Sequence, residues 1–178
     1  MTLTTRQSVR PIARAFSLAE AILATAVVGG LVVATLTAVG SAEASRRLAS
    51  DRSLARVLAD DLLAEIASKP YRDPQGGAGL GLDAGESIGP TRTLLDDVDD
   101  YDGLTEKPPV FADGSEVPGA AQYTRHTGVV WADPDDPGGK AAAAESGLKR
   151  ITVTVTRAGK VLATATTLRS AGWEAVRR

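Results

Sequence analysis

The sequence predicts an α+β protein in which one long N-terminal helix packs on a small antiparallel β-sheet. Three observations favour this fold class. A run from Ala21 to Ala42 is apolar and free of charge, an amphipathic stretch follows it as far as Lys69-Pro70, and the last third of the chain alternates with the period of two that is typical of strands. A chain of 178 residues has the length of one domain.

The composition excludes several classes of site. The chain has no cysteine, which excludes disulfides, zinc-thiolate sites and a cysteine nucleophile. Its single histidine, His126, cannot build a multi-histidine metal site, and we expect it at the surface or rim of a strand. The charge is nearly balanced, with 20 Lys and Arg against 22 Asp and Glu, so no basic patch indicates a nucleic-acid partner. With no phosphate-binding glycine loop and no Ser/His/Asp set to assign, we expect that the chain is not an enzyme.

The first fifteen residues differ from the rest of the chain. They carry three arginines and no acid, and they precede the apolar run directly. A basic, acid-free start of this kind is typical of a targeting segment and is kept out of the fold. By the positive-inside rule, it also predicts that the N-terminus stays in the cytoplasm.

The apolar run is long enough to cross a membrane. As a helix, the 22 residues from Ala21 to Ala42 would extend about 33 Å, which spans the hydrocarbon core of a bilayer. One interpretation is a plain single-pass anchor. A second is a secretory signal peptide cut after Ala42-Glu43-Ala44, although a usual signal core has only about 7–15 apolar residues. A third depends on the residues just before the run.

Residues 15–20 read Ala-Phe-Ser-Leu-Ala-Glu and connect the basic leader to the apolar run. This arrangement resembles the cleavage and methylation motif of type IV prepilins and type II secretion pseudopilins. The resemblance implies that a prepilin peptidase cuts between Ala15 and Phe16, that the new amine of Phe16 is N-methylated, and that Glu20 is the assembly residue. Leu18 matches the apolar residue of the motif, while Ala15 stands where the family usually has glycine.

A physical role for Glu20 follows from its position. An unpaired acid at the middle of a bilayer costs about 2.5–3.5 kcal/mol on insertion scales. The amine that cleavage creates on Phe16 can neutralise this acid, on the same chain or on an adjacent subunit, and only one axial register permits the pairing. Glu20 would then set the register of assembly. The alternative is that Glu20 lies at the headgroup level and makes no specific contact.

Beyond the apolar run, the pattern stays helical but becomes one-sided. We expect an apolar stripe on a helix that runs from Phe16 to about Ser68, ended by Lys69-Pro70 because the residue before proline avoids the helical region. The stripe consists of Ala44, Leu48, Leu54, Leu58, Leu62 and Ile66, with Val57 beside them. This half of the helix needs a partner surface.

The middle of the chain is rich in Gly, Pro and Asp, and we expect loops there with one short element at Thr91–Leu95. The stretch LLDDVDDYDGL holds clustered acids, and hard cations such as calcium take clustered carboxylates. The candidate ligands are Asp97, Asp99, Asp100 and Asp102. The EF-hand pattern fails, however, because Val98 occupies its first place and Pro109 its twelfth. We therefore expect no cofactor, with a solvated turn as the common explanation of such a run and calcium as the alternative.

The C-terminal part reads as antiparallel strands. QYTRHTGVVW alternates weakly, and KRITVTVT is followed by a tight turn at Arg157-Ala158-Gly159-Lys160 and a further strand from Val161 to about Leu168. We expect at least three strands that bury one face against the amphipathic helix. The chain thus divides into a leader (1–15), a membrane and assembly half of the helix (16–42), an amphipathic half (43–69), a loop-rich connection (70–120) and a sheet region (121–178).

The segments LADDLLAEIASKPYRDP, DDVDDYDGL and KRITVTVT are similar to those of the D-type minor pilins of mannose-sensitive haemagglutinin pili. Together, the two resemblances imply a structural subunit, major or minor, of a type IV pilus or a type II secretion pseudopilus. They imply inner-membrane insertion with the soluble domain outside, processing by prepilin peptidase, and helix packing with other pilin or pseudopilin subunits. The alternative from another class is a membrane-tethered or secreted binding module with an acidic, calcium-binding loop.

Overall fold

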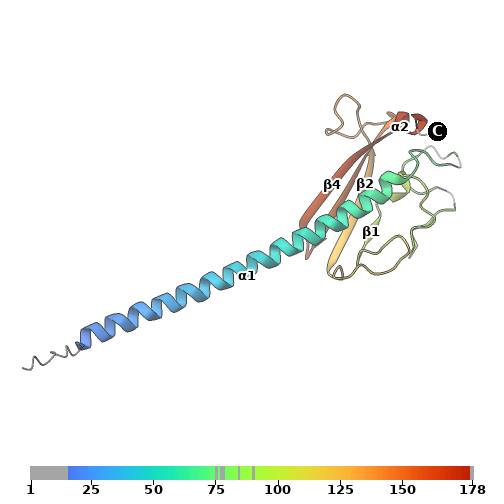
Figure 1. Ribbon diagram of the computed structural model, residues 1–178. Helices are drawn as coiled ribbons and strands as arrows, with labels where there is room; N and C mark the ends of the chain where they lie inside the picture. Colours follow the sequence, from blue (N-terminus) through green and yellow to red (C-terminus); the bar gives the residue numbers. More distant parts are fainter. Residues whose placement is uncertain (1–15, 75, 77–78, 84, 90, 177–178) are drawn as a thin grey trace, which may run out of the picture. The chain divides into compact units, whose positions relative to one another are not determined.

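The computed structural model describes residues 16–74, 76, 79–83, 85–89 and 91–176. Their elements follow the order α1, η1, β1, β2, β3, β4, α2 (Figure 1). Contacts divide the chain into two units, residues 1–46 and 47–178. The first contains the beginning of α1, and the second contains the end of α1 with everything that follows it.

Helix α1 extends from Leu18 to Ser68, 51 residues in all. The predicted end is confirmed, because Pro70 prevents the helix from continuing. The start lies two residues later than expected, since Ser17 caps the helix rather than joining it. The sequence-based prediction of one long N-terminal helix is confirmed.

The first half of α1 is exposed on all sides within the described residues. Three threonines in it donate their hydroxyl hydrogens to the carbonyl four residues earlier: Thr25 to Ala21, Thr35 to Leu31 and Thr37 to Val33, at 2.8–2.9 Å. These bonds satisfy the hydroxyls inside the helix, as an apolar environment requires. Among the described residues, α1 alone is long and apolar enough to cross a membrane.

The sheet has four antiparallel strands in the order β1-β2-β3-β4. They are β1 (Thr105–Glu106), β2 (Tyr123–Trp131), β3 (Leu148–Arg157) and β4 (Lys160–Ser170). The three longer strands were predicted and are confirmed, whereas β1 and the short C-terminal helix α2 (Ala171–Val176) were not foreseen. The tight turn between β3 and β4 is also confirmed: Ala158 (φ 49°) and Gly159 (φ 75°) both take the positive φ that a two-residue hairpin turn of this hand requires.

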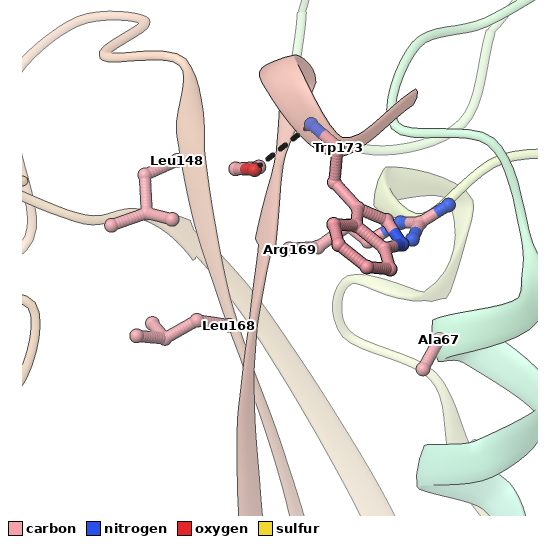
Figure 2. A pocket seen from close by; sticks show the side chains of 6 residues that line it. Ala67, Leu148, Leu168, Arg169 and Trp173 are labelled. Atoms are coloured by element: carbon pink, nitrogen blue, oxygen red, sulfur yellow. Dashed lines mark hydrogen bonds between the residues drawn. The ribbon is translucent and has the colours of Figure 1, made fainter. Parts of the chain in front are cut away.

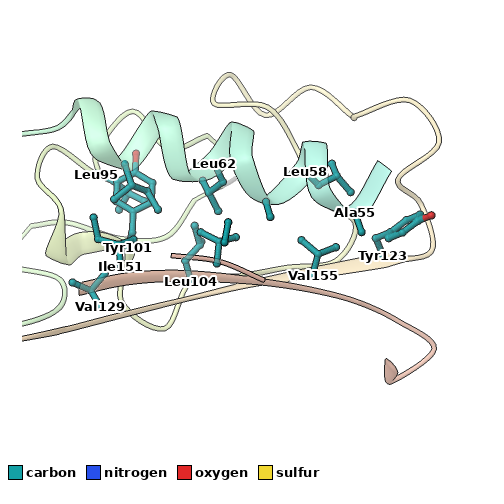
Figure 3. Packing of buried hydrophobic residues seen from close by; sticks show 14 of the residues in the cluster. Ala55, Leu58, Leu62, Leu95, Tyr101, Leu104, Tyr123, Val129, Ile151 and Val155 are labelled. Atoms are coloured by element: carbon teal, nitrogen blue, oxygen red, sulfur yellow. The ribbon is translucent and has the colours of Figure 1, made fainter. Parts of the chain in front are cut away.

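The core lies between the second half of α1 and one face of the sheet (Figure 3). From the helix come Leu58, Leu62 and Ile66, together with Ala55 and Ala59, whose small side chains allow a close approach to the strands. From the strands come Val129, Ile151, Val153, Val155 and Ala165. Burying these apolar side chains is the main force that holds the helix on the sheet.

The predicted stripe is therefore correct only in part. Leu58, Leu62 and Ile66 are buried, but Leu48 is exposed and Val57 is 61% exposed. Val57 precedes Leu58 by one residue, which rotates it by about 100° around the helix and away from the sheet. The buried alanines replace it on the inner face.

The connection between α1 and the sheet packs into the core as well. No helix or strand forms at Thr91–Leu95, where the structure has turns, so that expectation is wrong. Instead, a single 3-10 turn, η1, forms at Asp99–Tyr101. The apolar side chains around it are buried: Leu95, Val98, Tyr101 and Leu104.

Candidate functional sites

The start of α1 is a reciprocal capping pair. The hydroxyl of Ser17 accepts a hydrogen bond from the backbone N–H of Glu20 at 3.2 Å. In return, Glu20 Oε2 accepts from the backbone N–H of Ser17 at 3.0 Å and from its hydroxyl at 3.2 Å. This is the capping box, in which two helix-end donors are satisfied at once. The sequence-based prediction gave Glu20 either a role in assembly or a place at the headgroup level, and this local role was not foreseen.

The predicted processing residues lie beside the capping box. Phe16 precedes the helix and is 85% exposed. Ala15, the residue predicted on the other side of the cut, lies outside the described residues. Along α1, Glu20 is the first charged residue, and the next is Glu43. A single carboxylate thus stands at the head of an apolar, exposed helical surface.

A buried ion network joins α1, the connecting segment and the sheet. Arg92 contacts Glu106 and donates to Glu65 on α1, from Nε at 2.8 Å and from Nη2 at 2.6 Å. Arg125 on β2 donates from Nε to Glu106 at 2.7 Å. Arg125 is fully buried and Glu106 is 8% exposed, so each charge depends on the other for compensation.

Hydrogen bonds to backbone carbonyls complete this network. Arg125 Nη1 donates to the carbonyl of Leu58 on α1 at 3.0 Å, and Nη2 donates to the carbonyl of Val110 at 2.7 Å. The Tyr101 hydroxyl donates to Glu65 at 2.9 Å. Burial alone would raise the pKa of Glu65, but the hydrogen bond and charge of Arg92 outweigh it and hold that pKa below its usual value. The network therefore ties the helix to the sheet.

The four predicted calcium ligands lie around η1, but their oxygens already serve the protein. Asp97 Oδ1 accepts from the backbone N–H groups of Asp99 and Asp100, and Asp100 Oδ2 accepts from those of Asp96 and Asp97. Asp102 Oδ1 accepts from the backbone N–H of Val129 at 2.8 Å. These bonds fold the acidic run into a compact turn, so the expectation of a solvated turn is wrong for Asp97, Asp99 and Asp100, which are all buried.

Asp99 pairs with a buried lysine. Lys149 on β3 contacts Asp99 through its ammonium group, which also donates to the carbonyl of Tyr71 at 2.5 Å and lies 4.5 Å from the centre of the Tyr71 ring. Burial raises the pKa of Asp97 to about 7, and the neighbouring charge of Asp99 adds to the effect. The turn is thus held by the ammonium group of Lys149 and by the hydrogen bonds that its carboxylates accept from backbone N–H groups.

A different set of carboxylates has a geometry suited to a cation. Oxygens of Asp73, Glu86 and Asp96 lie within 4.8 Å of one another, and none of these residues was among the predicted ligands. The N–H of Asp83 lowers the pKa of Glu86, but partial burial and the charge of Asp100 outweigh it and leave this pKa raised. These residues come from three separate loop segments, so no local spacing in the sequence indicated the cluster.

A cavity of about 330 Å³ opens near the C-terminal end of the described chain (Figure 2). Ala67, Leu148, Leu168 and Trp173 give it a largely apolar lining, to which Arg169 adds a polar edge. The backbone N–H of Trp173 donates to the hydroxyl of Ser170 at 3.2 Å. Among the side chains that the structure describes, the lining of this cavity includes no acid, histidine or cysteine.

His126 is exposed, as expected, and its Nδ1 lies 2.9 Å from the hydroxyl of Thr105.

Comparison with known proteins returns nothing: no family model, no curated protein and no solved structure matches this chain.

Proposed function

We propose that this chain is a prepilin-type subunit of a type IV pilus or a type II secretion pseudopilus. In this proposal a prepilin peptidase removes residues 1–15, Phe16 is N-methylated, and the subunit enters a filament by packing its helix against those of other subunits. The chain acts as a substrate of processing and as a building block, and it catalyses nothing itself.

One observation carries the proposal. A single helix, α1, is apolar and exposed over its first half, yet packs one face against the sheet over its second half. An exposed apolar surface of that size needs lipid or other helices around it. A plain anchor needs only the apolar half, whereas a subunit that assembles through its helix needs both halves in one continuous element.

The charges support a direction of insertion into the membrane and an axial register for packing of the helices. The arginine-rich leader keeps the N-terminus on the cytoplasmic side of the inner membrane, which places the sheet domain outside. Glu20 stands at the head of the apolar surface, close in sequence to the amine that cleavage would create on Phe16. Pairing of these two groups within a bundle of helices would compensate both charges.

The second candidate function is a membrane-tethered or secreted binding module that takes calcium. The carboxylates of Asp73, Glu86 and Asp96 favour it, because their oxygens lie within 4.8 Å of one another and calcium takes clustered carboxylates. Secretion would require cleavage after Ala44. That position lies well inside α1, and a continuous helix is a poor protease substrate.

Photo-crosslinking in cells tests the subunit function. The probe residue replaces Leu31, which is 62% exposed on the apolar half of α1, and a control probe replaces Val161, which is 61% exposed on the β3–β4 hairpin. The proposal predicts that the probe at Leu31 crosslinks to the helix of another pilin-like subunit in the sheared filament fraction. Crosslinks from Leu31 to lipid alone, with none to protein in that fraction, would support a plain anchor.

A further inference from the structure

We propose that Ser17 and Glu20 together fix the start of α1 at Leu18, so that Phe16, the residue after the processing bond, lies before the helix. Ser17 is then a positioning residue for cleavage. This inference rests on the proposed function, and it adds a reason why the peptidase finds its bond accessible.

The hydrogen bonds at the helix start show how the helix is stopped. The Ser17 carbonyl accepts the first helical bond, from the N–H of Ala21 at 3.1 Å. In a longer helix, the N–H of Ser17 would donate to the carbonyl of residue 13, four positions earlier. That N–H is instead donated to Glu20 Oε2 at 3.0 Å. Extending the helix toward the leader would therefore break the reciprocal bonds of the capping box.

The capping box is needed to end the helix, because no residue of the leader close to the bond between Ala15 and Phe16 would do so. Ala13, Arg14 and Ala15 are among the best helix-forming residue types. Pro11 is no barrier either, since proline is tolerated in the first turn of a helix. Without the capping box, the helix is free to extend over the bond between Ala15 and Phe16.

Cleavage depends on the fraction of molecules in which the bond is open. When opening is fast compared with cleavage, the rate of proteolysis follows the population of the open form. Loss of a serine cap destabilises the end of a helix by about 1 kcal/mol, which corresponds to about a fivefold change in the population of the open form. Glu20→Ala alone keeps the Ser17 hydroxyl as a cap, so this single substitution should have only a small effect on the rate of cleavage.

The experiment compares two double variants of the full chain in membranes with a prepilin peptidase. Ser17→Ala with Glu20→Ala removes both halves of the box. Ser17→Thr with Glu20→Gln removes the same charge but keeps residues that can form a capping box. Ser41→Ala is the control for a helical hydroxyl elsewhere, since Ser41 only bonds the carbonyl of Ala38. The cleaved fraction is followed over time by mass spectrometry.

A second measurement reports the helix start without reference to cleavage. The chain has two phenylalanines, so carbonyl ¹³C labelling of phenylalanine gives two signals, one of them from Phe16. We expect the double alanine variant to move the Phe16 signal to a helical shift and to be cut about fivefold more slowly or worse. The Thr/Gln variant and Ser41→Ala should match the wild type in both measurements.

Two results would overturn the inference: cleavage of the double alanine variant at the wild-type rate, or a Phe16 signal in that variant that stays non-helical. Failure of the peptidase to cut the wild-type chain overturns the proposed function instead. In that case, the Phe16 signal still decides whether Ser17 and Glu20 set the start of the helix.

Discussion

Arg125 on β2 and Glu106 on β1 form an ion pair inside the interface between helix and sheet, with Arg125 Nε donating to Glu106 Oε2 at 2.7 Å. The same arginine reaches the carbonyl of Leu58 on α1. The pair therefore connects two neighbouring strands to the helix that covers them, at a position where the alternation of β2 points into the core.

Replacing Arg125 with methionine should destabilise the sheet domain by about 3–5 kcal/mol, because Glu106 would keep its buried charge and lose a partner. The measurement is denaturant unfolding of the full chain in detergent, followed by tryptophan fluorescence. Arg56→Met is the matched control, since Arg56 pairs with Asp60 in an exposed i,i+4 arrangement, and it should cost about 0.5 kcal/mol. A loss below about 1 kcal/mol for the Arg125 variant would contradict a structural role for the network.

Glu20→Ala and Glu20→Gln separate the charge of Glu20 from its capping role. Both variants should be processed, because the Ser17 hydroxyl still caps the helix. Both should enter filaments about tenfold less efficiently, as expected if a pairing worth about 1.4 kcal/mol is lost. Quantitative blotting of the sheared fraction against whole cells measures this. If Glu20→Gln assembles like the wild type, the carboxylate charge does not set the register.

Asp97 should make the folded domain less stable as the pH rises toward neutrality. Burial raises its pKa to about 7, so the folded state holds this proton more tightly than the unfolded chain does. Its contribution is present in full below about pH 4 and is lost as the pH rises through about 7. Asp97→Asn mimics the protonated form, keeps the acceptor for Asp99 and Asp100, and should flatten this slope.

Glu65 should act in the opposite direction and at lower pH. Its pKa is held below the usual value of 4.5 by Arg92 despite its burial, so its contribution is present above that value and is lost as the pH falls through the folded pKa. Unfolding curves between about pH 3 and 8 measure both slopes. A stability that keeps rising from pH 5 to 8 in the wild type would contradict the raised pKa of Asp97.

Calcium addition tests the acidic cluster. At a free calcium concentration ten times the dissociation constant, a single site would stabilise the folded chain by about 1.4 kcal/mol. Glu86→Gln should abolish this gain, whereas Asp113→Asn, which changes an exposed acid whose oxygen bonds Ser115, should retain it. Thermal unfolding with calcium and with a chelator gives the answer. Equal midpoints in the two conditions would exclude calcium as a ligand of the cluster.

Local patterns were enough to predict the main elements of this fold. The charge-free run, the Lys69-Pro70 stop and the alternation around Ile151–Val155 each depend on neighbours a few residues apart, and the structure confirms the elements that they indicated. The inner face of α1 was harder to predict. Ala55 and Ala59 are buried because the sheet lies against them, and small residues give no hydrophobic signal of their own.

The features that were missed depend on contacts between distant segments. Arg125 lies in an inward strand position, where Glu106 compensates its charge and the carbonyls of Leu58 and Val110 accept its remaining hydrogen bonds. Asp99 is buried because Lys149 compensates its charge from another strand. Such pairs leave no pattern within either segment. The capping box at Ser17 and Glu20 is different, because its spacing of three residues can be recognised within one segment of the sequence. It was missed because the prediction for Glu20 concerned assembly and not the local hydrogen bonds of the helix.

The N-terminus of the protein isolated from native membranes tests the central claim most directly. Mass spectrometry of the N-terminal peptide should find a chain that begins with N-methylated Phe16, with residues 1–15 absent. A chain that still begins at Met1 would identify a plain anchor, and one that begins at Ser45 would identify ordinary secretion. Either result would contradict the account given for α1 and Glu20.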